Sequence, residues 1–142
     1  MIRQTDERLN PIRTWGCYFC SILAMDEDVY GKPYTVNEIL DIWFRNWTEN
    51  DLDIESSVQN PQGLLDDLSG KLEFVGKLGP EYQTKPEEKE ILVFHNERTN
   101  YTHYVYGDGY GRCKWDPILN SVTVREGRVI GKRIFRRKLE ER

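Results

Sequence analysis

The first half of the chain carries its hydrophobic residues at helical spacing. Residues 17–25 place apolar side chains every three or four positions, which predicts a helix with one buried face. Thr35 and Glu38 have the spacing of a capping box, a pair in which each side chain bonds to the other residue's backbone N–H. We therefore expect a second helix to begin there and to end near Trp47.

A third helix is predicted by Asn60 and Pro61, because an asparagine N-cap followed by proline is typical of a helix start. Leucines recur after it at helical spacing. We expect this helix to be short, to include Leu68 and to continue to about Leu72.

The second half of the chain changes to short apolar or alternating runs separated by turn residues, which is typical of β-strands. The expected strands are residues 91–94, 101–106, 113–116, 121–124 and 128–135. Pro117 is expected to end the strand before it. The last two strands are expected to form a hairpin around Glu126 and Gly127. The pattern predicts an α+β fold, with N-terminal helices packed on a C-terminal antiparallel β-sheet.

Composition narrows the functional classes. The chain has 142 residues, 38% hydrophobic and 31% charged, with no repeat or linker, so we expect a single soluble domain over residues 1–142. A net charge of −4 argues against a nucleic-acid-binding protein. The polar N-terminus and the lack of long apolar runs argue against a signal peptide or a membrane partner. Three cysteines are too few for a disulfide scaffold, so a cytoplasmic protein with reduced thiols is expected.

The stretch TWGCYFC contains Cys17 and Cys20, and three chemistries are open for it. A Cys-x-x-Cys pair at a helix start can cycle between dithiol and disulfide, although residues 1–13 lack the strand that precedes such a pair in thioredoxin-like folds. With Cys113 and a histidine the pair could also form a Cys3His zinc site. Cys113, however, has no cysteine or histidine within nine residues.

The third chemistry is nucleophilic catalysis by Cys17. A helix that begins after Gly16 favours a thiolate at its N-terminus, and its N–H groups can face an oxyanion. The base must be His95 or His103, the two histidines of the chain. His103 lies in an alternating strand, and Asp116 follows thirteen residues later, beyond a glycine-rich turn. Two adjacent antiparallel strands could bring the carboxylate beside the imidazole to orient it.

These residues resemble a known family. Residues 16–25 (GCYFCSILAM) resemble the GC…(T/S)-x-L-A-M helix of papain-like cysteine peptidases. Residues 103–105 (HYV) and 116–117 (DP) resemble the later motifs of the same superfamily. The order Cys, His, Asp is similar to that of the bacteriocin-processing (double-glycine leader) peptidases and their small stand-alone relatives in bacteria, phages and plasmids.

The resemblance implies a papain-like fold and a Cys-His-Asp triad without a cofactor or metal. By it, Cys17 is the nucleophile, His103 the base and Asp116 the group that orients the base. The substrate would be a peptide or protein whose amide or isopeptide bond is cleaved through a thioester. Cys20 falls where the family has a small residue packed in the helix.

The sequence departs from this family just upstream of the nucleophile. The family commonly has a glutamine six residues before it, donating to the oxyanion, and Pro11 stands there in this chain. Asn10 could take that role if the loop is shifted, while Gln4 is thirteen residues upstream. We also expect Trp15 and Gly16 to lie near the substrate, with Gly16 allowing a close approach.

A second function stays open beside the hydrolase: a catalytically weak or inactive papain-like module that binds or inhibits another protein, such as a host-interaction factor. The missing glutamine favours the binding module, and the intact Cys, His and Asp favour the enzyme. The sequence carries no signal for the oligomeric state.

Overall fold

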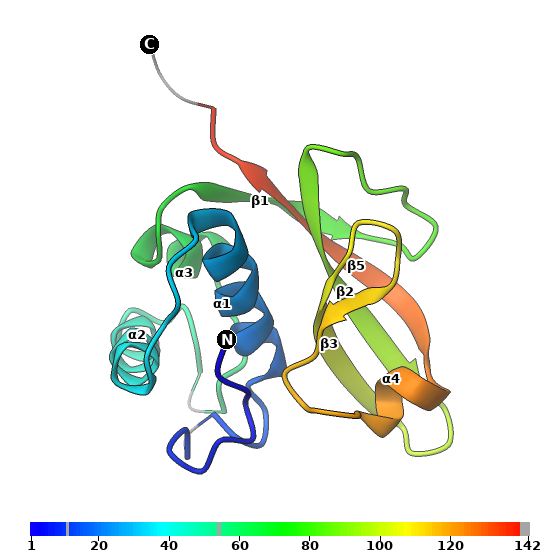
Figure 1. Ribbon diagram of the computed structural model, residues 1–142, viewed down its shortest axis with the longest axis horizontal. Helices are drawn as coiled ribbons and strands as arrows, with labels where there is room; N and C mark the ends of the chain where they lie inside the picture. Colours follow the sequence, from blue (N-terminus) through cyan, green and yellow to red (C-terminus); the bar gives the residue numbers. More distant parts are fainter. Residues whose placement is uncertain (11, 54, 140–142) are drawn as a thin grey trace.

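The computed structural model describes residues 1–10, 12–53 and 55–139. Within them the chain forms four helices and a five-stranded antiparallel sheet, an α+β arrangement with α1, α2 and α3 on one side of the sheet and the short α4 beside the strands on the other (Figure 1). The helices are α1 (Cys17–Tyr30), α2 (Val36–Thr48), α3 (Pro61–Asp67) and α4 (Val122–Glu126). The strands are β1 (Leu72–Leu78), β2 (Glu88–Asn96), β3 (Tyr101–Gly107), β4 (Cys113–Trp115) and β5 (Arg128–Arg137).

The three helices predicted in the first half are confirmed. The capping box of α2 is complete: Thr35 Oγ1 accepts from the N–H of Glu38 at 3.2 Å, and the Glu38 carboxylate accepts from the N–H of Thr35 at 3.1 Å. Asn60 Oδ1 caps α3 by accepting from the N–H of Gly63 at 3.1 Å. Local hydrogen bonds therefore determine where these helices begin.

The end of α3 differs from the prediction. The helix stops at Asp67, and Gly70 soon afterwards adopts a left-handed φ of 73° that a helix cannot continue through. Leu72 begins strand β1, which was not predicted. This segment is extended because it pairs with β5, which lies far along the chain, from Leu72 opposite Arg137 to Leu78 opposite Lys132.

The predicted C-terminal hairpin is wrong. Val122–Glu126 is the short helix α4, although its β-branched residues are typical of a strand. β5 pairs with β1 on one side and with β2 on the other, so neither of its edges is free for a hairpin partner. The strands predicted around residues 91–94, 101–106 and 113–116 are present as β2, β3 and β4, and β4 ends before Pro117.

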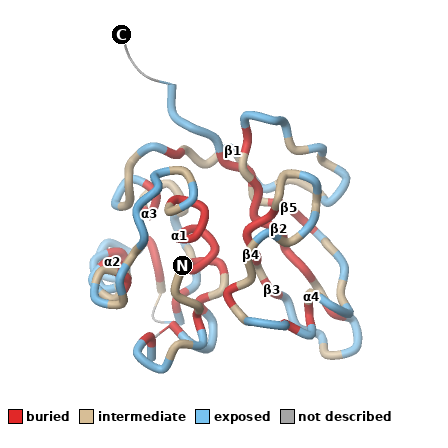
Figure 2. The backbone as a smooth tube through the Cα atoms, in the orientation of Figure 1, coloured by how far each residue is buried: buried red, intermediate tan, exposed pale blue. Residues whose placement is uncertain are grey.

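The sheet has the strand order β1-β5-β2-β3-β4. Helix α1 packs on β3 and β2 and is buried along most of its length (Figure 2). One hydrophobic core contains residues of α1, α2, α3 and the sheet. Leu65, Ile91 and Phe135 are among them. A smaller cluster around Leu92 and Val105 lies on the other face of the sheet.

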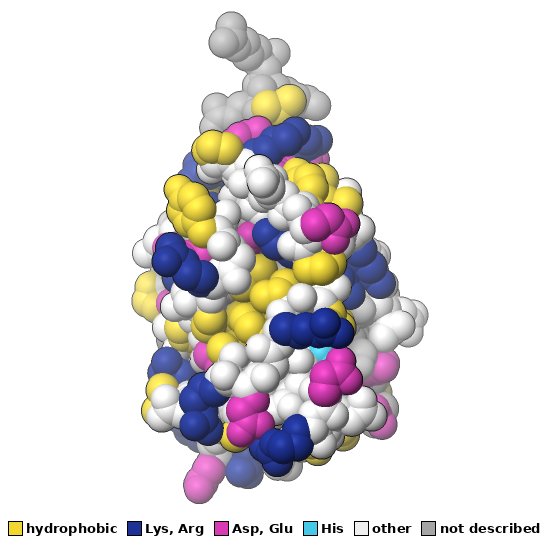
Figure 3. All heavy atoms as spheres, turned by 90° about the vertical axis from the view of Figure 1, so that its right-hand side faces the viewer, with side chains coloured by type: hydrophobic (Ala, Val, Ile, Leu, Met, Phe, Trp, Pro, Cys, Tyr) yellow, Lys and Arg dark blue, Asp and Glu magenta, His cyan; other side chains and the backbone are white. Residues whose placement is uncertain are grey.

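The side of the molecule formed by the strands carries a group of hydrophobic side chains bordered by Lys and Arg (Figure 3). Among the described residues, no helix combines the length and apolar character needed to cross a lipid bilayer.

Candidate active site

The N-terminus of α1 presents Cys17. Cys17 is the first residue of the helix, and Gly16 before it supplies no side-chain cap. The first N–H groups of a helix have no partner inside the helix, so they are available to an anion next to the Cys17 side chain. This arrangement matches the expectation that Cys17 lies at a helix start.

Gly16 is required by packing within the protein. A Cβ on Gly16 would lie 2.5 Å from the carbonyl oxygen of Ile12 and would collide with the Ile12 side chain. The N–H of Gly16 donates to that same carbonyl at 2.9 Å. The absence of a side chain therefore lets the preceding turn approach α1 closely, which differs from the close approach of a substrate expected for this glycine.

Ser21 connects α1 to the strand that carries the histidine. Its side chain is fully buried, and Ser21 Oγ lies 2.7 Å from the Cys17 carbonyl oxygen and 3.1 Å from the Tyr104 carbonyl oxygen. The hydroxyl can donate to either carbonyl. Because Tyr104 follows His103, this contact fixes the start of α1 beside the histidine.

Strands β3 and β4 bring His103 and Asp116 together. The two strands pair through Tyr106 opposite Trp115 and Gly107 opposite Cys113. Their connection returns the chain so that His103 Nε2 lies 2.6 Å from Asp116 Oδ1.

The Asp116 carboxylate is itself held in place from its own loop. Asp116 Oδ1 also accepts the N–H of Ile118 at 2.8 Å. With Nε2 donating to the carboxylate, the second ring nitrogen of His103, Nδ1, is left for another partner.

Cys17 is the second group that interacts with this imidazole. His103 is 5% exposed, and the Cys17 thiol at the start of α1 interacts electrostatically with its ring. Burial disfavours the charged imidazolium, but the hydrogen bond to Asp116 and the interaction with Cys17 outweigh it and raise the pKa of His103 from 6.5 to about 9. The surroundings of His103 therefore favour its imidazolium form at neutral pH.

The other two thiols have different environments. Cys20 is fully buried one turn into α1, and burial raises the pKa of its thiol far above the usual range. Cys113 is half-buried, and burial together with Asp116 and Asp108 raises its pKa to about 11. All three cysteines are free thiols. Cys20 is thus a packing residue, and Cys113 is held in the protonated form.

The cysteines and histidines do not assemble a ligand set. Within residues 1–10, 12–53 and 55–139, no group of three or more His, Cys, Asp or Glu side chains is arranged to hold a metal ion. The Cys3His arrangement considered from the sequence is therefore not formed by the described residues.

The residues upstream of α1 are placed as follows. Asn10 is exposed, and Trp15 is exposed over 53% of its surface beside the start of α1. Gln4 is 1% exposed, and its Nε2 donates to the Arg13 carbonyl at 2.9 Å. Pro11, the position at which the family has a glutamine, lies outside the described residues. One of the two N–H groups of the Gln4 amide is thus used within the protein.

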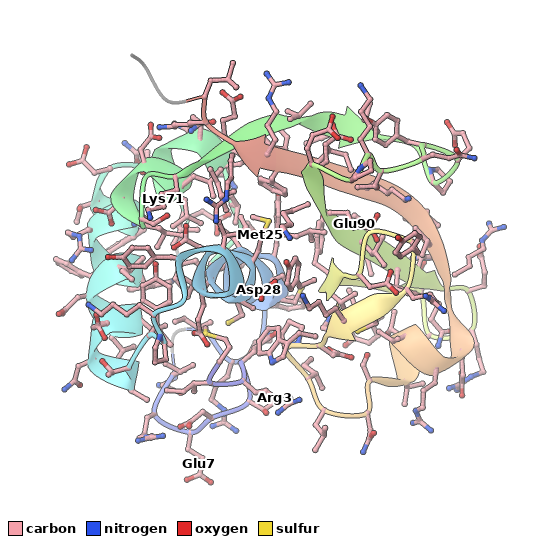
Figure 4. The ribbon with its side chains drawn as sticks, turned by 45° about the horizontal axis from the view of Figure 1, so that its top comes forward. Arg3, Glu7, Met25, Asp28, Lys71 and Glu90 are labelled. Atoms are coloured by element: carbon pink, nitrogen blue, oxygen red, sulfur yellow. The ribbon has the colours of Figure 1, made fainter. Side chains whose placement is uncertain are left out.

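The N-terminal segment was not expected to contribute to this region. Arg3 Nε donates to the Asp116 carbonyl oxygen at 3.2 Å, and the Arg3 guanidinium lies over the Trp115 ring at 5.9 Å (Figure 4). The N–H of Gln4 donates to the Pro117 carbonyl at 3.1 Å. These contacts join chain segments more than a hundred residues apart, so no local pattern could have indicated them.

A cavity of 410 Å³ lies between α1 and β4 and is lined by Asp28, Tyr106, Lys114 and Trp115, among others. Asp28 accepts from the Tyr106 hydroxyl at 2.7 Å and from Lys114 Nζ at 2.9 Å. Neither Cys17 nor His103 lines this cavity. The candidate site is therefore defined by side-chain contacts at the start of α1.

Comparison with protein families assigns the chain. A family described as a protein of unknown function, DUF261, matches residues 1–137. The chain belongs to the DUF261 family. No curated protein and no solved structure matches it. The chemistry of this DUF261 protein is therefore inferred from the side chains that meet at the start of α1.

Proposed function

We propose that this DUF261 protein is a cysteine hydrolase with a papain-like arrangement, which cleaves a peptide or isopeptide amide bond. The observation that carries the proposal is the placement of three side chains: His103 bonds to Asp116 at 2.6 Å, and the Cys17 thiol is near enough to raise the pKa of the imidazole. A nucleophile, a base and an orienting group in this order are what covalent amide hydrolysis requires. The three residues come from α1, from β3 and from the loop after β4.

In the first step the Cys17 thiolate attacks the carbonyl carbon of the amide. A C–S bond forms and the carbonyl oxygen becomes an oxyanion. The His103 imidazolium then donates its Nδ1 proton to the amide nitrogen, the C–N bond breaks, and an amine leaves. Asp116 keeps the imidazole oriented and stabilises its charged form. A thioester to Cys17 remains.

In the second step water hydrolyses the thioester. The neutral His103 takes a proton from a water molecule while the oxygen of that water attacks the thioester carbon. The C–S bond then breaks, which releases the acid and restores the thiolate beside the imidazolium. Since the pKa of His103 is raised to about 9, the imidazolium is available again at neutral pH for the next cycle.

The oxyanion would be stabilised by the backbone N–H groups at the start of α1. Gly16 leaves these groups without a side-chain cap. In enzymes whose oxyanion hole includes a side-chain donor, that donor increases the rate by a factor of about 10²–10³. Because Pro11 stands where the papain-like family has its glutamine donor, we expect backbone donors to serve this site and the enzyme to be slow.

Alkylation with iodoacetamide at pH 6, followed by mass spectrometry of each cysteine, tests the proposal. Cys17 is expected to react more than tenfold faster than Cys113, because a thiol with a pKa of about 11 is about one part in 10⁵ thiolate at that pH. His103→Ala should abolish this selectivity. His95→Ala is the matched control, since His95 bonds to Thr102 and not to Cys17. Equal rates at Cys17 and Cys113 in the wild-type protein would refute the proposal.

One observation favours a second function, a papain-like binding or inhibitory module. The papain-like family commonly has a glutamine donor six residues before the nucleophile, and this chain has Pro11 there. A randomised peptide library separates the two functions. Cleavage that is lost in Cys17→Ala supports the hydrolase. Retention of peptides without cleavage, alike in the wild-type and Cys17→Ala proteins, supports the binding module.

A further inference from the structure

A buried carboxylate joins the centre of the sheet to the loop between β3 and β4. Glu90 lies near the start of β2, is 0% exposed and extends toward this loop (Figure 4). Its Oε2 accepts the N–H of Gly109 at 3.1 Å and the N–H of Gly111 at 2.9 Å. One carboxylate oxygen therefore holds two backbone groups of the loop that connects the strand of His103 to Asp116.

The other carboxylate oxygen of Glu90 also has polar partners. Oε1 accepts from the Thr84 hydroxyl at 2.6 Å and lies 3.4 Å from Lys132 Nζ on β5. Lys132 is 5% exposed and donates to the Tyr82 carbonyl at 2.7 Å. A buried ion pair contributes little net stability compared with apolar residues of the same size, and its best-attested role is to specify one arrangement.

The loop is shaped to meet this carboxylate. Gly109 and Gly111 have left-handed φ values of 91° and 79°, which turn their N–H groups inward. At Gly107 a Cβ would lie 2.5 Å from Glu90 Oε2, so a side chain there would displace the carboxylate. The loop and Glu90 thus fit each other at three glycines.

Strand β4 needs such an anchor because its own pairing is short. It has three residues and two paired positions with β3, with an irregularity between them. A slip of one residue along β3 would turn the side chains of β4 to the opposite face. At its far end the segment is held by Arg3 and Gln4, which bond to the carbonyls of Asp116 and Pro117.

We propose that Glu90 is a positioning residue for the hydrolase site: through the N–H groups of Gly109 and Gly111 it fixes the register of β4, and thereby the contact between Asp116 and His103. This inference rests on the proposed function for its catalytic meaning. Glu90 acts at a distance from the nucleophile, through the loop and the short strand.

The test is the titration of His103 followed by NMR of the protein labelled with ¹⁵N-histidine. The chain has two histidines, so each signal can be assigned with one variant. The charged and polar groups that meet His103 are Cys17 and Asp116. In Glu90→Gln the pKa of His103 is expected to fall from about 9 toward 6.5, by one unit or more, which is about a tenfold loss of proton affinity. The His95 signal should not change.

Glu88→Gln is the matched control. Glu88 lies on the same strand, is 8% exposed, and accepts from the Tyr82 hydroxyl and the N–H of Lys85, both in the loop before β2. Removing its charge loosens that loop without touching the loop between β3 and β4. The pKa of His103 is expected to stay at the wild-type value, even where thermal stability falls.

A second variant is needed because Glu90→Gln leaves Lys132 buried without its carboxylate partner, which could prevent folding. The double substitution Glu90→Leu with Lys132→Met removes both buried charges and the acceptor for the loop, and the same fall in the His103 pKa is expected. An unchanged pKa in a folded variant overturns the inference. If neither variant folds, amide exchange in the wild-type protein decides: protection of Gly109 and Gly111 supports the anchor, and exchange as fast as in free loops overturns it.

The two proposals fail differently. If Cys17 of the wild-type protein is alkylated no faster than Cys113, the hydrolase is wrong. If Cys17 is selective and the pKa of His103 is the same in wild type and in the Glu90 variants, the hydrolase stands and the role of Glu90 is wrong.

Discussion

At the scale of single residues, the site depends on the environment of one imidazole. His103 and His95 are on neighbouring strands, and residue type alone does not choose between them. His103 is buried between Asp116 and Cys17, whereas the ring of His95 meets the Thr102 hydroxyl at 3.1 Å. The contacts, and not the residue type, distinguish His103 from His95 and make it the proton donor and acceptor of the proposed reaction.

The raised pKa of His103 predicts how stability changes with pH. A group whose pKa is higher in the folded state stabilises the fold fully below its unfolded value of 6.5, and this contribution is lost as pH rises to about 9. The difference corresponds to about 3 kcal/mol. Denaturant unfolding of the wild-type protein at pH 6.5 and pH 9.5 should show a loss of this order that is absent in His103→Gln. An equal loss in both proteins would contradict the prediction.

At the scale of elements, the start of α1 is fixed from two sides. Gly16 packs on the carbonyl of Ile12, and Ser21 meets the carbonyls of Cys17 and Tyr104. Helix starts with local caps could be predicted, because their hydrogen bonds join residues three apart, as in the capping box of α2. Segments whose state depends on a distant strand, such as β1 and α4, could not.

Gly16→Ala tests the close contact at the start of α1. The added methyl group meets backbone, which cannot move as a flexible side chain can, so a loss of about 1–3 kcal/mol in the free energy of unfolding is expected. Alkylation of Cys17 at pH 6 should slow with it, because Cys17 is the next residue.

Gly76→Ala is the control for this substitution. Gly76 lies in β1, and a Cβ there meets no heavy atom within 4 Å. Stability within about 0.5 kcal/mol of the wild-type value and an unchanged rate at Cys17 are expected. A Gly16→Ala protein as stable and as reactive as Gly76→Ala would argue against a tight contact at Ile12.

At the scale of the whole molecule, helices and sheet share one core. The larger cluster includes fully buried residues from α1, α3 and β5, such as Phe19, Leu65 and Phe135. The contact between β1 and β5 also joins the chain after α3 to its C-terminal strand. The two halves that contribute Cys17 and His103 are therefore parts of one packed unit.

A shared core predicts a single cooperative unfolding transition. Trp43 and Trp47 report on α2, and Trp115 reports on the edge of the sheet. Tryptophan fluorescence and far-UV circular dichroism, recorded over the same denaturant series, should give coincident midpoints. Two separated transitions would indicate that the helices and the sheet unfold independently.

The sequence by itself determined the helices with local caps, four of the strands (β2, β3, β4 and β5), and the order of Cys17, His103 and Asp116. These features depend on residue type and short-range spacing. The tertiary structure decided which edge of the sheet each segment pairs with, and so made β1 a strand and α4 a helix. It also brought Glu90 and Arg3 to the segments around Asp116 and set the pKa of His103, because these effects depend on contacts between distant parts of the chain.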